Sequence, residues 1–208
     1  MLRESIHVML DTSIIDKPHA FFDFVQKLES GNASGIARLY TRERRRIEGG
    51  RIYRRQLKSV YQHYPHLPLP ESADEKNDAI HFEHWVHQAD REVGSVIVLH
   101  GFAMGWPVID AMAMSASQWF ARGFNVILLT LPDHGPRRAP GTLFSGQSFT
   151  VPHAVHLATA VRRAMHEIFE LKRWLRSQSD QPVGLVGMSL GGYLASLCAG
   201  LSDDFDFL

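Results

Sequence analysis

The pattern of hydrophobic and polar positions divides the chain into a weakly patterned first part and a regular second part. Beyond residue 92, three short apolar runs rich in β-branched residues are typical of strands buried on both faces of a parallel sheet; they are 95–99 (SVIVL), 125–131 (NVILLTL) and 183–186 (VGLV). Helical spacing of apolar residues follows each of these runs and predicts helices over 111–122, 153–177 and 190–199. Gly123 stands where the first helix needs a C-terminal cap. Alternation of strands and helices predicts an α/β fold, a three-layer α/β/α arrangement with a mostly parallel sheet.

The first ninety residues carry weaker signals. Apolar residues at helical spacing predict a helix over 20–28 (AFFDFVQKL), and 36–47 is interpreted as a continuation of this helical region. The proline-rich stretch YPHLPLPES breaks any helix and indicates a linker or turn. Strand-forming residues over 80–87 (IHFEHWVH) predict an edge strand. We therefore expect a mainly helical N-terminal extension over 1–78 and a partial α/β domain over 79–208.

Composition indicates an ordinary globular chain. Of the 208 residues, 45% are hydrophobic and 21% are charged, which is unlike a disordered protein. Cys198 is the only cysteine, so an intrachain disulfide is impossible and a reducing compartment fits. The chain starts without an apolar stretch of secretory length, and no apolar run approaches the length of a membrane span. These features predict a cytoplasmic protein without a membrane span.

Charge is balanced over the whole chain but uneven locally. Lys and Arg together number 22, as do Asp and Glu, and this balance gives no reason to expect a nucleic acid or an anionic membrane as a partner. Residues 41–55 (TRERRRIEGGRIYRR) nevertheless hold seven arginines and only two glutamates. Such a run can be a solvated helix face, an interdomain contact or a basic docking patch.

The clearest chemical signal is the sequence VGLVGMSLGGYLASL. Its central part, from Gly187 through Ser189 to Gly191, fits the pattern Gly-x-Ser-x-Gly between an apolar strand and a helix. The pattern has a physical basis, because the serine needs a sharp, strained turn and the glycines remove side chains that would collide with the neighbouring elements. The hydroxyl then projects beside a helix N-terminus, where backbone N–H groups favour developing negative charge. Ser189 is therefore the candidate nucleophile, and the alternative is a helix-capping serine in a glycine-rich turn.

A second element, VIVLHGFAMG, lies upstream at the end of the first buried run. In this architecture the loop after that strand supplies one donor to the oxyanion and the residue after the nucleophile supplies the other. The candidate donors are the backbone N–H groups of Phe102 and Leu190, which would stabilise negative charge in a transition state. His100 and Gly101 are interpreted as residues that shape the loop rather than as catalytic groups.

A third element, LTLPDHGPRR, follows the second buried run and should border the same pocket. Asp133 and His134 are adjacent in sequence, so they cannot easily pair as acid and base, and we interpret both as loop-shaping or pocket-lining residues. His153 and His156 are spaced almost as a metal-binding pair, but no carboxylate or cysteine cluster accompanies them. We therefore predict neither a metal site nor a cofactor.

These three elements, in this order, resemble the α/β-hydrolase fold family over about residues 93–200. The chain looks most similar to its esterase-like and dienelactone-hydrolase-like members. The resemblance implies a serine hydrolase that acts on a small-molecule carboxylic ester, thioester or amide through an acyl-enzyme on Ser189.

The sequence departs from the family pattern after the nucleophile. In this family an acid and then a histidine follow the serine, but only 19 residues follow Ser189 here and none is a histidine. Asp203, Asp204 and Asp206 come too early to stand at the end of a later strand. We therefore expect the chain to be truncated after the helix that follows the nucleophile, with the acid and histidine beyond residue 208. The alternatives are a non-catalytic module that binds a partner or ligand, and an acyltransferase on the same fold.

Overall fold

A computed structural model describes residues 22–30, 38–61, 78–88, 92–150 and 154–208. Its strands are β1 (Arg38–Ile47), β2 (Gly50–Lys58), β3 (Ala79–His87), β4 (Gly94–Leu99), β5 (Phe124–Thr130) and β6 (Val183–Gly187). Its helices are α4 (Phe24–Ser30), α5 (Pro107–Ala113), α6 (Ala116–Ala121), α7 (Ala154–Arg176) and α8 (Leu190–Leu201), with short 3₁₀ turns η3 (Gly135–Arg137) and η4 (Gln147–Thr150). The proline-rich stretch predicted to be a linker lies outside the described residues.

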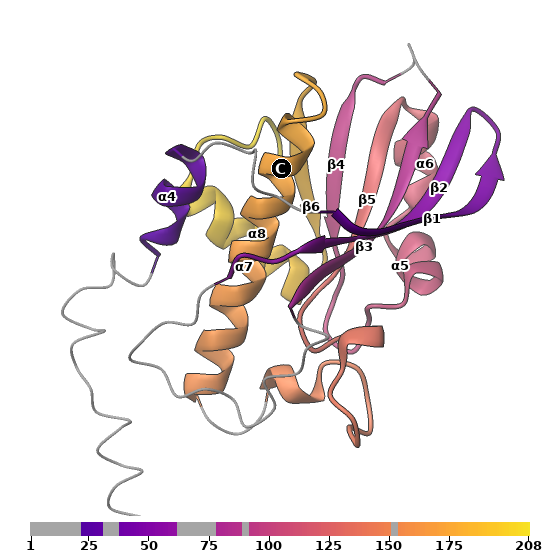
Figure 1. The fold of residues 1–208 in the computed structure, drawn as a ribbon. Coiled ribbons are helices and arrows are strands. Elements are labelled where there is room, and N and C mark those ends of the chain that lie inside the picture. Colours follow the sequence, from indigo (N-terminus) through magenta and orange to yellow (C-terminus); the bar gives the residue numbers. More distant parts are fainter. Residues whose placement is uncertain (1–21, 31–37, 62–77, 89–91, 151–153) are drawn as a thin grey trace, which may run out of the picture.

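The six strands form one mixed sheet in the order β1-β2-β3-β5-β4-β6. The strands β4, β5 and β6 are parallel, whereas β1, β2 and β3 pair antiparallel, and β3 also pairs antiparallel with β5. Figure 1 shows α4, α7 and α8 on one side of this sheet and α5 and α6 on the other. The predicted α/β fold class is thereby confirmed, with helices on both faces of the sheet; the sheet itself is mixed, with its parallel strands β5, β4 and β6 at the end opposite β1.

The core lies in two hydrophobic clusters, one on each face of the sheet. Side chains of β4 alternate between them: Ile97 and Leu99 join the larger cluster under α7 and α8, while Val96 and Val98 join the smaller one under α6. This explains why the whole strand is apolar, since both of its faces are covered. The predicted long helix is confirmed as α7, which begins at Ala154 and ends at Arg176.

Three predictions about individual elements are corrected. Residues 38–47 form the strand β1 rather than a continuation of a helix, because they pair with β2 through a turn at Gly49, whose φ is 76°. The strand β3 is not at an edge, because the hairpin of β1 and β2 extends the sheet beyond it. The helix predicted over 111–122 is divided into α5 and α6 at Ser115, which has the left-handed φ of 53°.

Candidate active site

Ser189 lies between the last parallel strand and the helix that follows it. Its backbone has φ of 52° and ψ of −115°, a conformation that residues with side chains rarely adopt, and it is the N-cap of α8. The turn is held on one side by a hydrogen bond from Met188 N–H to the carbonyl of Leu99, with 3.1 Å between N and O. Ser189 is exposed to solvent. Its hydroxyl is therefore presented at the carboxyl end of the parallel strands, where open α/β sheets bind their ligands.

The two glycines of the motif are required by close approaches of the backbone. A Cβ atom on Gly191 would lie 2.0 Å from the carbonyl oxygen of Leu99, and one on Gly187 would lie 2.3 Å from the carbonyl carbon of Gly191. No side chain fits at such distances without movement of the backbone. The Gly-x-Ser-x-Gly pattern thus corresponds to a turn in which β6, α8 and the end of β4 are in direct contact.

The loop after β4 lies against the same turn. A Cβ atom on Gly101 would contact the side chain of Met188 at 3.4 Å, so the structure brings this loop and the Ser189 turn together. Among the residues that the structure describes, no acceptor is bonded to the backbone N–H of Phe102 or to that of Leu190. Neither N–H group is therefore engaged within the described part of the chain.

His100 is buried and both of its ring nitrogens are occupied. Nε2 accepts a hydrogen bond from Leu131 N–H at 3.1 Å, so the proton lies on Nδ1, which donates to the carbonyl of Gly101 at 2.8 Å. Burial lowers the pKa of His100 to about 3. The imidazole consequently ties the loop after β4 to the loop after β5 and has no nitrogen left to act as a base.

His134 is also buried, and the loop after β5 is folded around it. Its Nδ1 lies 2.7 Å from the carbonyl oxygen of Pro132, whereas its Nε2 has no hydrogen-bond partner among the described residues. A Cβ atom on Gly146 would lie 2.3 Å from this Nε2, so the following segment packs directly on the ring. Burial lowers the pKa of His134. Asp133 beside it has a positive φ of 61°, which turns the chain at this point.

The comparison with protein families decides which fold family these elements form. Residues 96–206, more than half of the chain, match the model of the family described as "Alpha/beta hydrolase family". The chain belongs to the α/β-hydrolase family. Two uncharacterized proteins, from two strains of Mycobacterium tuberculosis, are each 35% identical to it over 113 residues, which is 52% of this chain. The chain spans only 26% of the length of these relatives.

Solved structures similar to this α/β hydrolase include three esterases. A candidate acetyl xylan esterase from Bacteroides fragilis superposes with a TM-score of 0.61 and 12% identity, over 91% of this chain and 51% of that one. Acetyl Xylan Esterase 1 from Thermoanaerobacterium sp. gives a TM-score of 0.55 and 15% identity, over 89% and 55%. A cold-adapted esterase from an Arctic intertidal metagenomic library gives 0.54 and 11%, over 79% and 61%. At these identities the likeness shows the shared fold.

Two polar residues that support the site were missed by the sequence analysis. The Asp110 carboxylate on α5 is buried and accepts the N–H of Gly105 at 3.1 Å, and burial raises its pKa to about 6. The Ser145 hydroxyl is buried between two loops of the domain, accepting Gly135 N–H at 2.7 Å and donating to the carbonyl of Met104. Ser145 joins two loops, and the bond between Asp110 and Gly105 links α5 to the loop just before it, so no sequence motif marks either residue.

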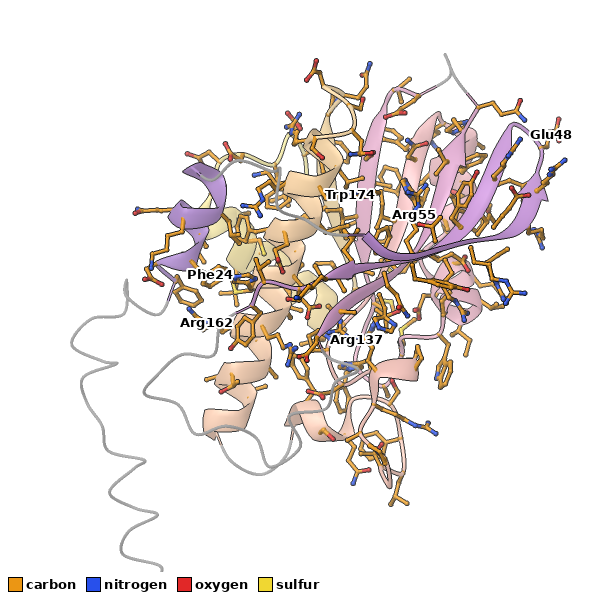
Figure 2. All side chains as sticks on the ribbon, in the orientation of Figure 1. Phe24, Glu48, Arg55, Arg137, Arg162 and Trp174 are labelled. Atoms are coloured by element: carbon orange, nitrogen blue, oxygen red, sulfur yellow. The ribbon has the colours of Figure 1, made fainter. Side chains whose placement is uncertain are left out.

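A buried ion pair fixes the loop that carries His134. Arg137 donates to both carboxylate oxygens of Glu167 on α7 at 2.7 Å and to the carbonyl of Thr130 at 2.8 Å, and both charged side chains are fully buried. Figure 2 shows Arg137 beside the lower part of α7. The bidentate geometry is the strongest form of such a pair. It holds the loop after β5 in place beside the loop of Phe102.

Apolar side chains are exposed at Met188, next to Ser189, and on the loops after β4 and β5. Phe102, Phe144 and Met188 each expose more than a third of their surface, and the Phe102 ring meets the ring of Phe144 edge-on at 6.0 Å. Within the described part of the chain, no group of three His, Cys, Asp or Glu side chains could hold a metal ion. His153 lies outside the described residues, as does the side chain of His156. Across the same residues, none of the helices has both the length and the apolar character of a membrane span.

Proposed function

We propose that this chain carries the nucleophile of a serine hydrolase that cleaves a carboxylic ester through an acyl-enzyme on Ser189. The observation that supports this most is the strained, solvent-exposed turn of Ser189 with two unpaired N–H groups beside it. In the reaction the serine hydroxyl gives its proton to a base while its oxygen attacks the carbonyl carbon of the ester, and the carbonyl oxygen becomes an oxyanion. Collapse of this intermediate expels the alcohol, which takes up the proton, and leaves an acyl-enzyme that water then hydrolyses to the acid. The N–H groups of Phe102 and Leu190 donate to that oxyanion, a contribution of about 3 kcal/mol for a well-placed donor.

The proposed substrate is a small-molecule ester with an apolar acyl group. The exposed side chains of Phe102, Phe144 and Met188 offer hydrophobic contact on the side from which the substrate reaches Ser189. Similar folds in two acetyl xylan esterases and a cold-adapted esterase support an ester as the bond that is cleaved. A thioester or an amide presents the same carbonyl to the nucleophile and is a second substrate class for the same mechanism.

We further propose that the base and the acid come from chain beyond residue 208. His100 has no free nitrogen, and His134 is buried under Gly146, so the described histidines near the site do not offer a base to Ser189. Two backbone hydrogen bonds join the end of the chain to β6: Asp206 N–H donates to Val183, and Leu185 N–H donates to Phe207. This segment therefore runs along β6, where a further strand of the sheet would follow.

Fluorophosphonate labelling and hydrolysis of p-nitrophenyl acetate test this function. Both are measured on the 208-residue chain, on a chain extended along its reading frame, and on Ser189→Ala and Ser196→Ala variants of each. Ser196 is an exposed serine of the same helix, whose hydroxyl donates to Gly192, so it controls for non-specific labelling. We expect turnover and labelling only in the extended chain, lost in Ser189→Ala and kept in Ser196→Ala.

Two other outcomes would change the proposal. Activity of the 208-residue chain that Ser189→Ala abolishes would place the base within it, and His134→Gln would then be the variant that removes activity. A folded, extended chain that neither labels nor turns over would overturn the serine-hydrolase proposal and leave a non-catalytic α/β-hydrolase module.

A further inference from the structure

The arginine-rich run of the sequence forms a two-stranded hairpin at the edge of the sheet. The hairpin is made of β1 and β2 and lies at the opposite end of the strand order from β6 (Figure 1). Residues 38–58 hold nine Lys and Arg and two Glu, a net charge of +7. The remaining residues hold 13 Lys and Arg and 20 Asp and Glu, so the balanced total conceals a strong asymmetry.

The register of the hairpin places like charges directly opposite one another. Arg42 is paired with Arg54, and Arg46 is paired with Arg51. Glu43 lies between the second pair and bonds to both of its members, at 3.1 and 3.3 Å. Among the described residues, no carboxylate compensates the pair of Arg42 and Arg54 in this way. Like charges in opposite positions of an antiparallel ladder destabilise it, so this arrangement costs stability.

Four arginines of the hairpin have no carboxylate within 4.0 Å in the part of the chain that the structure describes: Arg42, Arg44, Arg45 and Arg54. All four are exposed to solvent. Arg55, by contrast, lies over the rings of Tyr53 and Trp174 and packs toward α7 (Figure 2). The exposed guanidinium groups are therefore available to an anion outside the chain.

Protection of the sheet edge explains only part of this pattern. Charged residues on an edge strand discourage pairing with other chains, which accounts for the arginines of β1. The strand β2 is paired on both sides, with β1 and with β3, and needs no such protection. It still carries Arg51 and Arg54, both exposed.

We propose that the β1–β2 hairpin is a binding surface for the phosphate backbone of a nucleic-acid duplex. Arginine binds phosphate in a bidentate way, and eight of the nine cationic residues of 38–58 are arginines. Alternate residues of a strand are about 6.7 Å apart, which is close to twice the rise of about 3.4 Å per phosphate along the axis of a duplex.

A lipid surface fits the hairpin less well. Its turn carries the exposed acidic residue Glu48 beside Gly49 (Figure 2), and Ile47 packs against the smaller hydrophobic cluster. From Arg42 to Arg51 the hairpin exposes no large apolar side chain that could enter a membrane. The inference is independent of the hydrolase activity, because it rests on the charge and geometry of a different part of the sheet.

Fluorescence anisotropy with a labelled DNA duplex of about 20 base pairs tests the proposal on the 208-residue chain. The test variant Arg42→Gln/Arg54→Gln removes the uncompensated pair. The control variant Lys27→Gln/Arg138→Gln removes two exposed charges from α4 and from the loop after β5. We expect the test variant to bind at least about tenfold more weakly at low salt and its salt slope to fall by about 2, while the control keeps its affinity.

Thermal stability separates a binding role from a structural one. Removal of one like-charge pair should leave the melting temperature unchanged or raise it, so binding and stability change in different directions. A second variant on the outer strand, Arg44→Gln/Arg45→Gln, should weaken binding in the same way. Three outcomes would each overturn the proposal. The first is an equal loss of duplex affinity in the test and control variants, and the second is binding to phosphatidylcholine vesicles with about 30 mol% phosphatidylserine that is tighter than binding to the duplex. The third is a lower melting temperature of the test variant together with no duplex binding.

Discussion

Ser189 occupies a backbone conformation that is stable only because its surroundings enforce it. Its φ of 52° and ψ of −115° cost on the order of 1–3 kcal/mol, which the contacts of β6, α8 and β4 must offset. The glycines make these contacts possible, since a side chain at Gly187 or Gly191 would overlap the backbone. The strained conformation of Ser189 therefore depends on the glycines on either side of it.

Replacement of Gly191 by alanine tests this feature. The new Cβ would lie 2.0 Å from the carbonyl oxygen of Leu99, so we expect Gly191→Ala to lose about 3 kcal/mol or more of stability and to lose labelling at Ser189. The control is Gly200→Ala in the same helix, where a Cβ meets nothing within 4 Å. That variant should be neutral or gain up to about 1 kcal/mol from helix propensity. Melting curves of the two variants measure the difference, and similar melting temperatures would show that the turn tolerates a side chain.

At the scale of residues, the sequence predicts the parts of the site that have a local pattern. Gly187, Ser189 and Gly191 are recognisable because one turn needs all three, and the motif places them within five consecutive residues. Asp110 and Ser145 are not recognisable, because a single carboxylate or hydroxyl that binds one backbone N–H of a loop follows no sequence motif. The structural role of such buried polar groups can be recognised only in the folded structure.

At the scale of elements, buried strands were predicted more accurately from the sequence than exposed ones. The strands β4, β5 and β6 are apolar on both faces and were predicted to within one or two residues of their bounds. In β1 the described residues 40–46 are all exposed and so show no buried stripe, and its many arginines are as compatible with a helix face as with an edge strand. Only the pairing with β2 fixes it as a strand. The break between α5 and α6 was also missed, because serine seldom adopts the left-handed conformation seen at Ser115.

The loop after β5 depends on the ion pair of Arg137 and Glu167. Removal of one partner leaves a buried charge without compensation, so we expect Arg137→Met and Glu167→Leu each to lose about 3–5 kcal/mol. The double variant should recover most of this loss, because an apolar pair of similar volume needs no desolvation of charge. Urea unfolding of the four proteins gives the coupling free energy. Additive losses would show that Arg137 acts mainly through its bond to Thr130.

At the scale of the whole molecule, several titratable groups are enclosed in the two layers between sheet and helices. His84 lies under Trp174 on one face of the sheet, and neither of its ring nitrogens has a hydrogen-bond partner among the described residues. Burial lowers the pKa of His84 and that of His100 to about 3. Burial raises the pKa of Asp110 to about 6 on the opposite face. The fold therefore holds two histidines neutral and favours protonation of one carboxyl group.

Acid should destabilise this fold well above the pKa values of its exposed carboxylates. In the unfolded chain His84 and His100 bind protons below about pH 6.5, whereas in the folded chain they stay neutral until about pH 3. Their contribution to stability is complete above pH 6.5 and is lost as the pH falls from 6.5 toward 3, by about 1.4 kcal/mol per pH unit for each histidine. Asp110 has the opposite sign, since its folded form binds a proton below about pH 6 and its unfolded form only below about pH 4. The net loss between pH 5.5 and 4.5 should therefore correspond to about one proton from these three groups.

The variant His84→Leu removes one histidine and an unpaired buried imidazole, so it should raise the free energy of unfolding at neutral pH and flatten its dependence on pH. Urea unfolding midpoints at pH 7.5, 6.5, 5.5 and 4.5 measure both effects, and a variant with the same pH dependence as the original chain would show that His84 is already protonated in the folded state.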